Sequence, residues 1–327
     1  MADYVDVNGV SMWYDDRGEG DFVVLLHGGL TDSRDFSGNL DALAGRFRLL
    51  LPERRGHGRT ADVPGPITIE VMAQDIIAFL DKIVAAAVRL VGYSAGAAVA
   101  LRVAVSRPDL VDRLVLVSGG FHPDGMILRP TADDQPPAPL VAAYAEVSPD
   151  GADHFPVVLA KIAHSAAEEP GMAPADLRAV TCPALVMTAD DDIVTLEHTL
   201  ELYRALPNAE LAVVPRTSHL LLHEKPELCT GLVTDFLSSE PAPTWMPVSR
   251  AGSHTAFGPF SHEQGNLPPD LAKPARRALV AAGFTHLGQL TLVSEADLGR
   301  LHGMGPKAMD QLRRALTANG LSFAEER

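Results

Sequence analysis

The chain has 327 residues, 46% of them hydrophobic, and a formal net charge of −15. This length is sufficient for two packed domains, and the acidic balance argues against a general surface for binding polyanions. Two cysteines, Cys182 and Cys229, cannot form a disulfide framework, and neither lies in a metal-ligand spacing, so no metal or cofactor is expected. No segment resembles a signal peptide or a transmembrane span, which predicts a cytoplasmic protein without a membrane partner.

The first elements of the chain are predicted strands. Residues 4–7 and 11–14 alternate in polarity and are joined by Asn8-Gly9, the strongest short signal for a β-hairpin. Residues 22–26 form a continuous apolar run, which is typical of a strand buried on both faces. The chain therefore begins with a hairpin that leads into a central strand.

Strands and helices then alternate up to residue 240, apart from one insertion. This alternation predicts an α/β fold with a mostly parallel eight-stranded sheet and helices on both faces. Residues 121–178 break the pattern with proline, acidic residues and two weak helical signals, so we expect them to form a small cap. The remaining strands are predicted at 47–51, 89–93, 114–117, 184–187 and 211–214, and the helices at 33–44, 68–84, 95–105, 197–205 and 226–237.

The motif Gly92-x-Ser94-x-Gly96 lies between a predicted strand and an alanine-rich helix. In this context the serine occupies a sharp turn that presents its hydroxyl at the carboxyl edge of the sheet. The neighbouring residues must be small, and both glycines and Ala95 satisfy that requirement. Ser94 is therefore predicted to be a nucleophile.

A serine hydroxyl needs a base to accept its proton and an acid to orient that base. His219 follows the last predicted strand and precedes a helix, which is a suitable position for the base. Three adjacent carboxylates, Asp190, Asp191 and Asp192, follow the strand before it, and one of them is expected to be the acid. No other histidine has a comparable context, although His27 is positioned to fix the loop that would hold an oxyanion.

Residues 1–240 resemble the α/β-hydrolase superfamily over essentially their whole length. The departures are mild: Glu53, Thr60 and Ala189 stand where the family usually has aspartate, serine and glycine. The matching motifs are His27-Gly28-Gly29, the stretch 53–60, the serine motif 92–96, the stretch 189–192 and Thr217-Ser218-His219.

The resemblance implies acyl transfer by a triad of Ser94, His219 and an aspartate. Asp192 is the preferred acid, with Asp191 as the alternative. The backbone amides of Ala95 and Gly29 would bind the oxyanion, and Leu30 is the alternative second donor.

The serine at the turn also restricts the reaction. Family members that open epoxides or displace halide use aspartate there, so those reactions are disfavoured. We expect a carboxylic ester hydrolase or a lactonase acting on a small to medium, largely apolar substrate. Thioesterase, amidase, carbon–carbon hydrolase and perhydrolase activities remain alternatives. Phe121, Tyr144 and Phe155 of the cap are candidate walls of the substrate pocket.

The C-terminal part of the chain differs from the rest. Residues 241–267 are proline-rich without periodicity and predict a linker, while residues 264–327 carry eight basic against six acidic side chains. Residues 268–327 predict a small all-α domain that resembles a helix-hairpin-helix unit, as in the C-terminal domain of the RNA polymerase α subunit. Its Gly303-x-Gly305 turn would approach a phosphate, with charge from Lys307, Arg313 and Arg314.

Two other classes of function compete with a serine hydrolase. A non-hydrolytic binding or sensor protein could have the same fold, but it has no need of all three triad groups. A nucleic-acid-associated protein would act through residues 268–327, by weak nucleic-acid contact; protein contact or a purely structural role is the alternative for that segment. Salt-dependent binding of DNA by this segment would support the nucleic-acid hypothesis, and no binding at low salt would end it.

Overall fold

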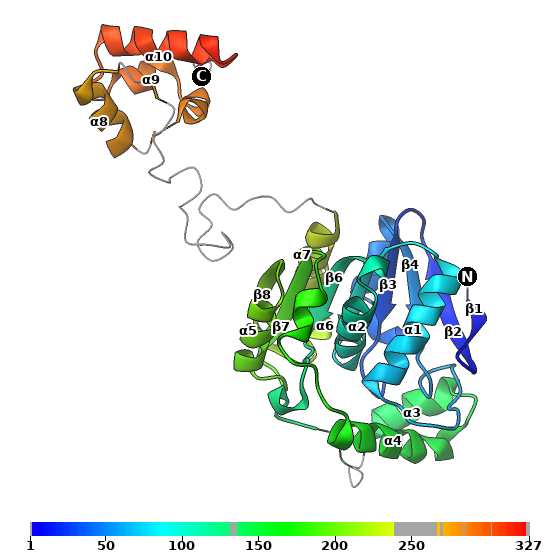
Figure 1. Ribbon diagram of the computed structural model, residues 1–327. Helices are drawn as coiled ribbons and strands as arrows, with labels where there is room; N and C mark the ends of the chain where they lie inside the picture. The colour runs from blue at the N-terminus through cyan, green and yellow to red at the C-terminus, as the bar shows by residue number, and fades with distance from the viewer. Residues whose placement is uncertain are drawn as a thin grey trace. The chain divides into compact units, whose positions relative to one another are not determined.

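A computed structural model describes residues 2–129, 131, 136–238, 267–268, 271–282, 284, 286–301 and 303–324 (Figure 1). The chain divides into two units, Met1–Pro241 and Ala242–Arg327. Almost all of the predicted linker at 241–267 lies outside the described residues. Each unit is described by itself below.

The first unit is built on an eight-stranded sheet with the order β1-β2-β4-β3-β5-β6-β7-β8. The pairings of β2 with β1 and β4 are antiparallel and the other five are parallel, so the sheet is mixed. Asn8 and Gly9 form the hairpin turn, both with positive φ, as the sequence predicts. The strands are β1 (Asp3–Val7), β2 (Val10–Arg17), β3 (Phe22–Leu26), β4 (Arg48–Pro52), β5 (Val88–Tyr93), β6 (Val111–Val117), β7 (Ala184–Asp191) and β8 (Ala209–Ser218).

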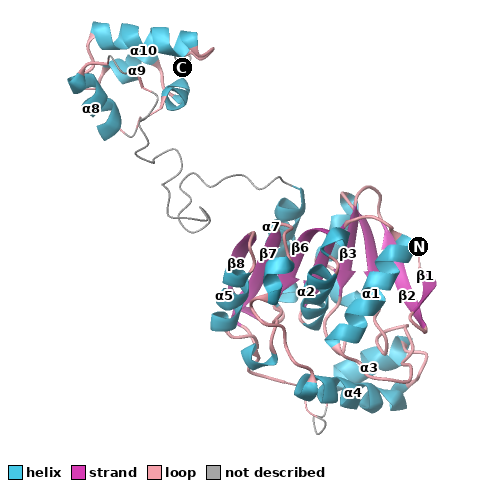
Figure 2. Ribbon diagram, in the orientation of Figure 1, coloured by secondary structure: helices cyan, strands magenta, loops and turns pink. Residues whose placement is uncertain are grey.

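Helices and turns cover both faces of this sheet (Figure 2). Successive residues of β3 belong to opposite cores: Val24 packs against α1 and α2, whereas Val23 packs on the side of α7. This explains the continuous apolar run, because each face of the strand is buried against a different layer. The helices of the two layers are α1 (Ile69–Ile83), α2 (Ala95–Ser106), α5 (Leu196–Ala205), α6 (Leu221–Glu224) and α7 (Pro226–Ser238).

The segment predicted as one helix at 33–44 instead forms two 3-10 turns, η1 (Ser33–Phe36) and η2 (Leu40–Gly45). Gly38 lies between them with a φ of 78°, which an α-helix cannot accommodate. Asn39 then begins the second turn by accepting a hydrogen bond from the Leu40 amide. The prediction of a single helix rested on the helical spacing of apolar residues, and that spacing gives no indication of the interruption at Gly38.

The cap leaves the sheet after β6 and returns before β7. Its helices are α3 (Ala138–Val147) and α4 (Phe155–Glu168), in the two places where the sequence shows weak helical signals. They lie together across one end of the sheet (Figure 1). Tyr144 and Phe155 are buried with their rings 4.7 Å apart, so two of the three predicted wall residues pack against each other. The third, Phe121, is buried against the ring of His198 and does not line the cavity that Tyr144 and Phe155 line.

The described part of the second unit contains helices α8 (Lys273–Ala281), α9 (Glu295–Gly299) and α10 (Pro306–Ala318) with a 3-10 turn, η7 (Leu287–Leu292). They enclose a separate apolar core that includes Leu279, Leu290 and Leu312. Arg313 pairs with Glu295 and Asp310, and Arg314 pairs with Asp310 at 2.8 Å. These ion pairs reduce the positive charge that a phosphate would meet.

A helix that crosses a lipid bilayer needs about 20 predominantly apolar residues. None of the described helices is both long enough and apolar enough to meet this requirement.

Candidate active site

Ser94 lies at the junction of β5 and α2. Its φ of 55° and ψ of −121° are strained for a residue with a side chain. Cβ atoms added to its flanking glycines would collide with backbone: at Gly92 within 2.2 Å of the Gly96 oxygen, and at Gly96 within 2.1 Å of the Leu26 oxygen. The sequence motif thus reflects a tight contact between the turn, the helix and strand β3.

We expect Gly96→Ala to destabilise the protein strongly. The added methyl group must push α2 away from β3, because both obstructing atoms are backbone oxygens. The expected cost is about 3 kcal/mol, or a fall in Tm of about 6–12 °C. The matched control is Gly231→Ala in α7, where an added Cβ meets nothing within 4 Å. Equal Tm values for the Gly96→Ala and Gly231→Ala variants would contradict this interpretation.

The structure brings together the three residues that the sequence singled out. Ser94 Oγ lies 2.8 Å from Nε2 of His219, and Nδ1 of His219 lies 2.7 Å from Oδ1 of Asp192. The Asp192 side chain is fully buried, and that of His219 is 19% exposed. A proton can therefore pass from the hydroxyl to the imidazole while the carboxylate holds the ring.

The neighbours of Asp192 distinguish it from the other two aspartates. Its Oδ2 accepts hydrogen bonds from Ser118 Oγ at 2.5 Å, Thr188 Oγ1 at 3.1 Å and the Ala189 amide at 3.3 Å. Although burial opposes ionisation, the hydrogen bonds from His219 and Ser118 outweigh it and lower the pKa of Asp192 to about 2. Asp191 is exposed, so the geometry favours Asp192.

Sequence reasoning missed two residues that hold these groups in place. Ser118 follows β6 with a φ of 49°, and this unusual backbone aims its hydroxyl at Asp192. Tyr93 donates its hydroxyl proton to the His219 carbonyl at 2.8 Å, and its ring stacks on the imidazole at 5.6 Å. The local signals were the position of Ser118 directly after a strand and that of Tyr93 beside Ser94 in the serine motif.

Gly29 and Ala95 lie side by side near Ser94. A Cβ built on Gly29 would be 3.4 Å from the Ala95 Cβ. In the described part of the chain, neither backbone amide donates a hydrogen bond to the protein. Leu30, the alternative donor, has a left-handed φ of 61°. Two unsatisfied amides beside the serine are suited to hold a negatively charged oxygen.

Hydrogen bonds from buried side chains hold the loop that carries Gly29 in place. Arg54 is fully buried, and its Nη2 donates to the carbonyls of His27 and Gly28, both at 2.7 Å. His27 donates from Nδ1 to the Gly28 carbonyl and accepts the Arg54 amide proton at Nε2, 3.2 Å away. His27 therefore has the local structural position expected from the sequence. Asp35 completes the arrangement by accepting the Gly28 amide proton.

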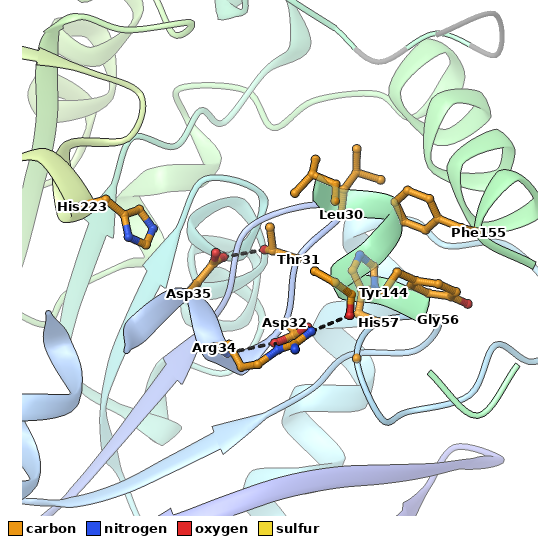
Figure 3. A pocket seen from close by; sticks show the side chains of 13 residues that line it. Leu30, Thr31, Asp32, Arg34, Asp35, Gly56, His57, Tyr144, Phe155 and His223 are labelled. Atoms are coloured by element: carbon orange, nitrogen blue, oxygen red, sulfur yellow. Dashed lines mark hydrogen bonds and ion pairs between the residues drawn. The ribbon is translucent and has the colours of Figure 1, made fainter. Parts of the chain in front are cut away.

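A cavity of about 190 Å³ opens beside this loop, beneath the cap (Figure 3). Arg34 crosses its edge, donating to Asp32 at 2.7 Å, to Glu146 at 2.8 Å and to the Ala143 carbonyl at 2.6 Å. The cap helix α3 is thereby tied to the loop of Gly29. The cavity is lined by Leu30, Thr31, Asp32, Arg34, Asp35, Gly56, His57, Gly58, Leu140, Ala143, Tyr144, Phe155 and His223.

A mostly parallel sheet with a strained serine after its central strand, and a histidine and an aspartate after later strands, defines the α/β-hydrolase class. Residues 23–232 match the family described as "Alpha/beta hydrolase family", and the chain belongs to it. Together with the relatives below, this shows that the protein is a hydrolase.

Two relatives are named for their activities. A "Putative carbamate hydrolase RutD" from Caulobacter sp. (strain K31) is 32% identical, over 67% of this chain and 91% of its own length. A "Putative non-heme bromoperoxidase BpoC" from Mycobacterium tuberculosis is 27% identical, over 70% of this chain and 98% of its own length. In both comparisons, nearly the whole of the relative corresponds to part of this chain.

Solved structures show the same fold. The enol-lactonase from Burkholderia xenovorans LB400 aligns with a TM-score of 0.60 at 24% identity, covering 72% of this chain and all of the other. A thermophilic esterase from Thermogutta terrifontis aligns with a TM-score of 0.59 at 23% identity, covering 72% and 98%. At these identities the alignments establish the fold alone.

Proposed function

We propose that this protein is a serine hydrolase that transfers an acyl group through Ser94, His219 and Asp192. The observation that carries the proposal is the unbroken chain of contacts from the serine hydroxyl through the imidazole to a buried carboxylate. His219 takes the hydroxyl proton as Ser94 attacks a carbonyl carbon, and the carbonyl oxygen becomes an oxyanion. The amides of Gly29 and Ala95 stabilise that oxyanion.

The remaining steps follow from the same groups. The protonated His219 gives its proton to the leaving group as the carbon–heteroatom bond breaks, which leaves an acyl-enzyme on Ser94. Water then attacks the acyl-enzyme while His219 accepts a proton from it. The bond between the acyl carbon and Ser94 Oγ breaks, His219 returns the proton to Oγ, and the acid product leaves. Asp192 stays ionised throughout and stabilises the imidazolium that forms in each half of the cycle.

The substrate class proposed is a small to medium ester or lactone without a negative charge. Leu30, Leu140 and Phe155 give the cavity an apolar wall. Its one described arginine, Arg34, is already paired with Asp32 and Glu146, so this side chain is not free to bind a carboxylate substrate. Carbamates are the second candidate, because the Caulobacter relative is named for them and they carry the same reacting carbonyl.

A fluorophosphonate probe tests the mechanism directly, because it phosphonylates only a serine that a base has activated. Trypsin cleaves after Arg89 and Arg102, and the peptide between them contains Ser94 as its single serine. We expect mass spectrometry to find the label on this peptide, at Ser94. Denatured protein is the control and should take up no label.

Two results would count against the proposal. Labelling at a different serine would assign the activity to another site. The absence of label under conditions where a known serine hydrolase reacts fully would favour the alternative class, a binding protein with the same fold.

A further inference from the structure

His57 is a buried, titratable side chain that the proposed mechanism does not use. It is only 3% exposed, yet it lines the cavity beside the loop of Gly29 (Figure 3). Leu30, which follows Gly29 in the chain, lines the same cavity. A ligand that reaches from the oxyanion position into this cavity would therefore come near the imidazole.

The hydrogen bonding of His57 fixes its tautomer. Nδ1 lies 2.8 Å from the Arg55 carbonyl, and a carbonyl can only accept, so Nδ1 carries the proton. Burial and the nearby Arg54 guanidinium lower the pKa of His57 to about 3, which keeps the ring neutral at physiological pH. Nε2 is therefore an acceptor with a free lone pair.

No described side chain supplies a donor to this nitrogen. Among the residues that the structure describes, His57 makes no second hydrogen bond, and its Nε2 is not sealed from the cavity. The arginine in the lining, Arg34, is directed at Asp32, Glu146 and the Ala143 carbonyl. A bound molecule that displaces water from this nitrogen leaves a desolvated acceptor unless it supplies a donor of its own, and an unpaired buried acceptor costs free energy.

We propose that His57 determines specificity by accepting a hydrogen bond at Nε2 from a hydroxyl or N–H group of the substrate. The inference rests on the proposed hydrolysis of a carbonyl substrate by Ser94 and narrows its class. The substrate is an ester, lactone or carbamate that carries a neutral donor some distance from the reacting carbonyl. An apolar body contacts Leu30, Leu140 and Phe155, while the donor reaches His57.

Two substitutions separate this role from the structural one. His57→Asn has an amide nitrogen at the distance of Nδ1 and can keep the bond to the Arg55 carbonyl, but it has no group in place of Nε2. His57→Gln places an amide oxygen at the distance of Nε2 and loses the bond to Arg55. If the role of His57 is purely structural, asparagine should preserve its function better than glutamine. If His57 binds the substrate, glutamine should preserve its function better than asparagine.

The probes are methyl esters of straight-chain acids of four to eight carbons. Each is prepared with a terminal methyl, hydroxyl or methoxy group: the methyl group has about the size of the hydroxyl, and the methoxy group keeps the oxygen but cannot donate. In the wild-type protein, we expect kcat/KM for the hydroxy ester of one chain length to exceed that of its methoxy partner about tenfold. His57→Asn should reduce this ratio to about one, and His57→Gln should retain most of it.

The outcomes separate the inference from the proposed function. If no hydroxy ester is preferred at any length, or if His57→Asn keeps the preference, the role of His57 is disproved, while turnover of the plain esters upholds the serine hydrolase. If no ester is turned over and no fluorophosphonate label appears, the proposed function itself fails. A cavity that holds only water gives the first of these results and so also overturns the inference.

Discussion

Ser94→Ala is expected to lower kcat by roughly 10⁴- to 10⁶-fold on any ester that the wild-type protein hydrolyses. The substitution removes the attacking oxygen but leaves the Gly29 and Ala95 amides and the cavity in place. KM should change little, because binding and the nucleophile are largely separate. Initial-rate kinetics with purified protein provide the measurement, and the residual rate should approach that of ester in buffer.

The control for this substitution is Ser106→Ala at the end of the same helix. It removes a hydroxyl group from α2 without touching the turn, and it should retain wild-type kcat. Circular dichroism and thermal melting should show both variants folded, since Ser94 makes no side-chain capping bond to the helix. A Ser94→Ala variant with more than a few per cent of wild-type kcat would refute the assignment of the nucleophile.

Asp192→Asn is expected to reduce kcat about 10⁴-fold with little change in the fold. Asparagine can place its N–H group against Nδ1 of His219, which then carries no proton. The proton moves to Nε2, where it blocks acceptance of the Ser94 proton. The imidazolium of the transition state also loses its counter-charge. The measurement is kcat under saturating ester.

The adjacent aspartates provide matched controls for this prediction. Asp191 is exposed, and Asp190 accepts the Thr217 amide proton at 3.0 Å, so neither carboxylate faces the imidazole. Asp191→Asn and Asp190→Asn should each change kcat less than about threefold, as exposed charges contribute little. A large loss with Asp191→Asn and a small one with Asp192→Asn would reverse the assignment of the acid.

The features that sequence predicted well are those that one short segment encodes. Asn8-Gly9 encodes its hairpin because both residues tolerate positive φ, and Gly92 and Gly96 record a backbone contact that excludes any side chain. The chain order of serine, acid and histidine also carried the prediction that these residues meet. The two local signals act through backbone geometry, which tolerates few substitutions, whereas the chain order belongs to the fold as a whole.

The features that sequence missed depend on contacts between distant segments. Ser118 meets Asp192 across 74 residues, and Arg34 meets Glu146 across 112 residues. The local sequence around a serine or an arginine is the same whether or not a distant residue becomes its partner. Gly38 shows a different limit, because it interrupts a segment whose apolar spacing still resembles a helix.

The contacts of Arg34 have a consequence for engineering the cap. One of its bonds reaches the carbonyl of Ala143, a backbone atom present whatever side chain occupies that position. Random mutagenesis along α3 will therefore rarely release the loop of Gly29, and libraries can vary the positions of this helix other than buried Tyr144 for new selectivity. A grafted cap of different length would move that carbonyl, and the bond from Arg34 would be lost. A transplanted cap should be built with its own replacement for Arg34.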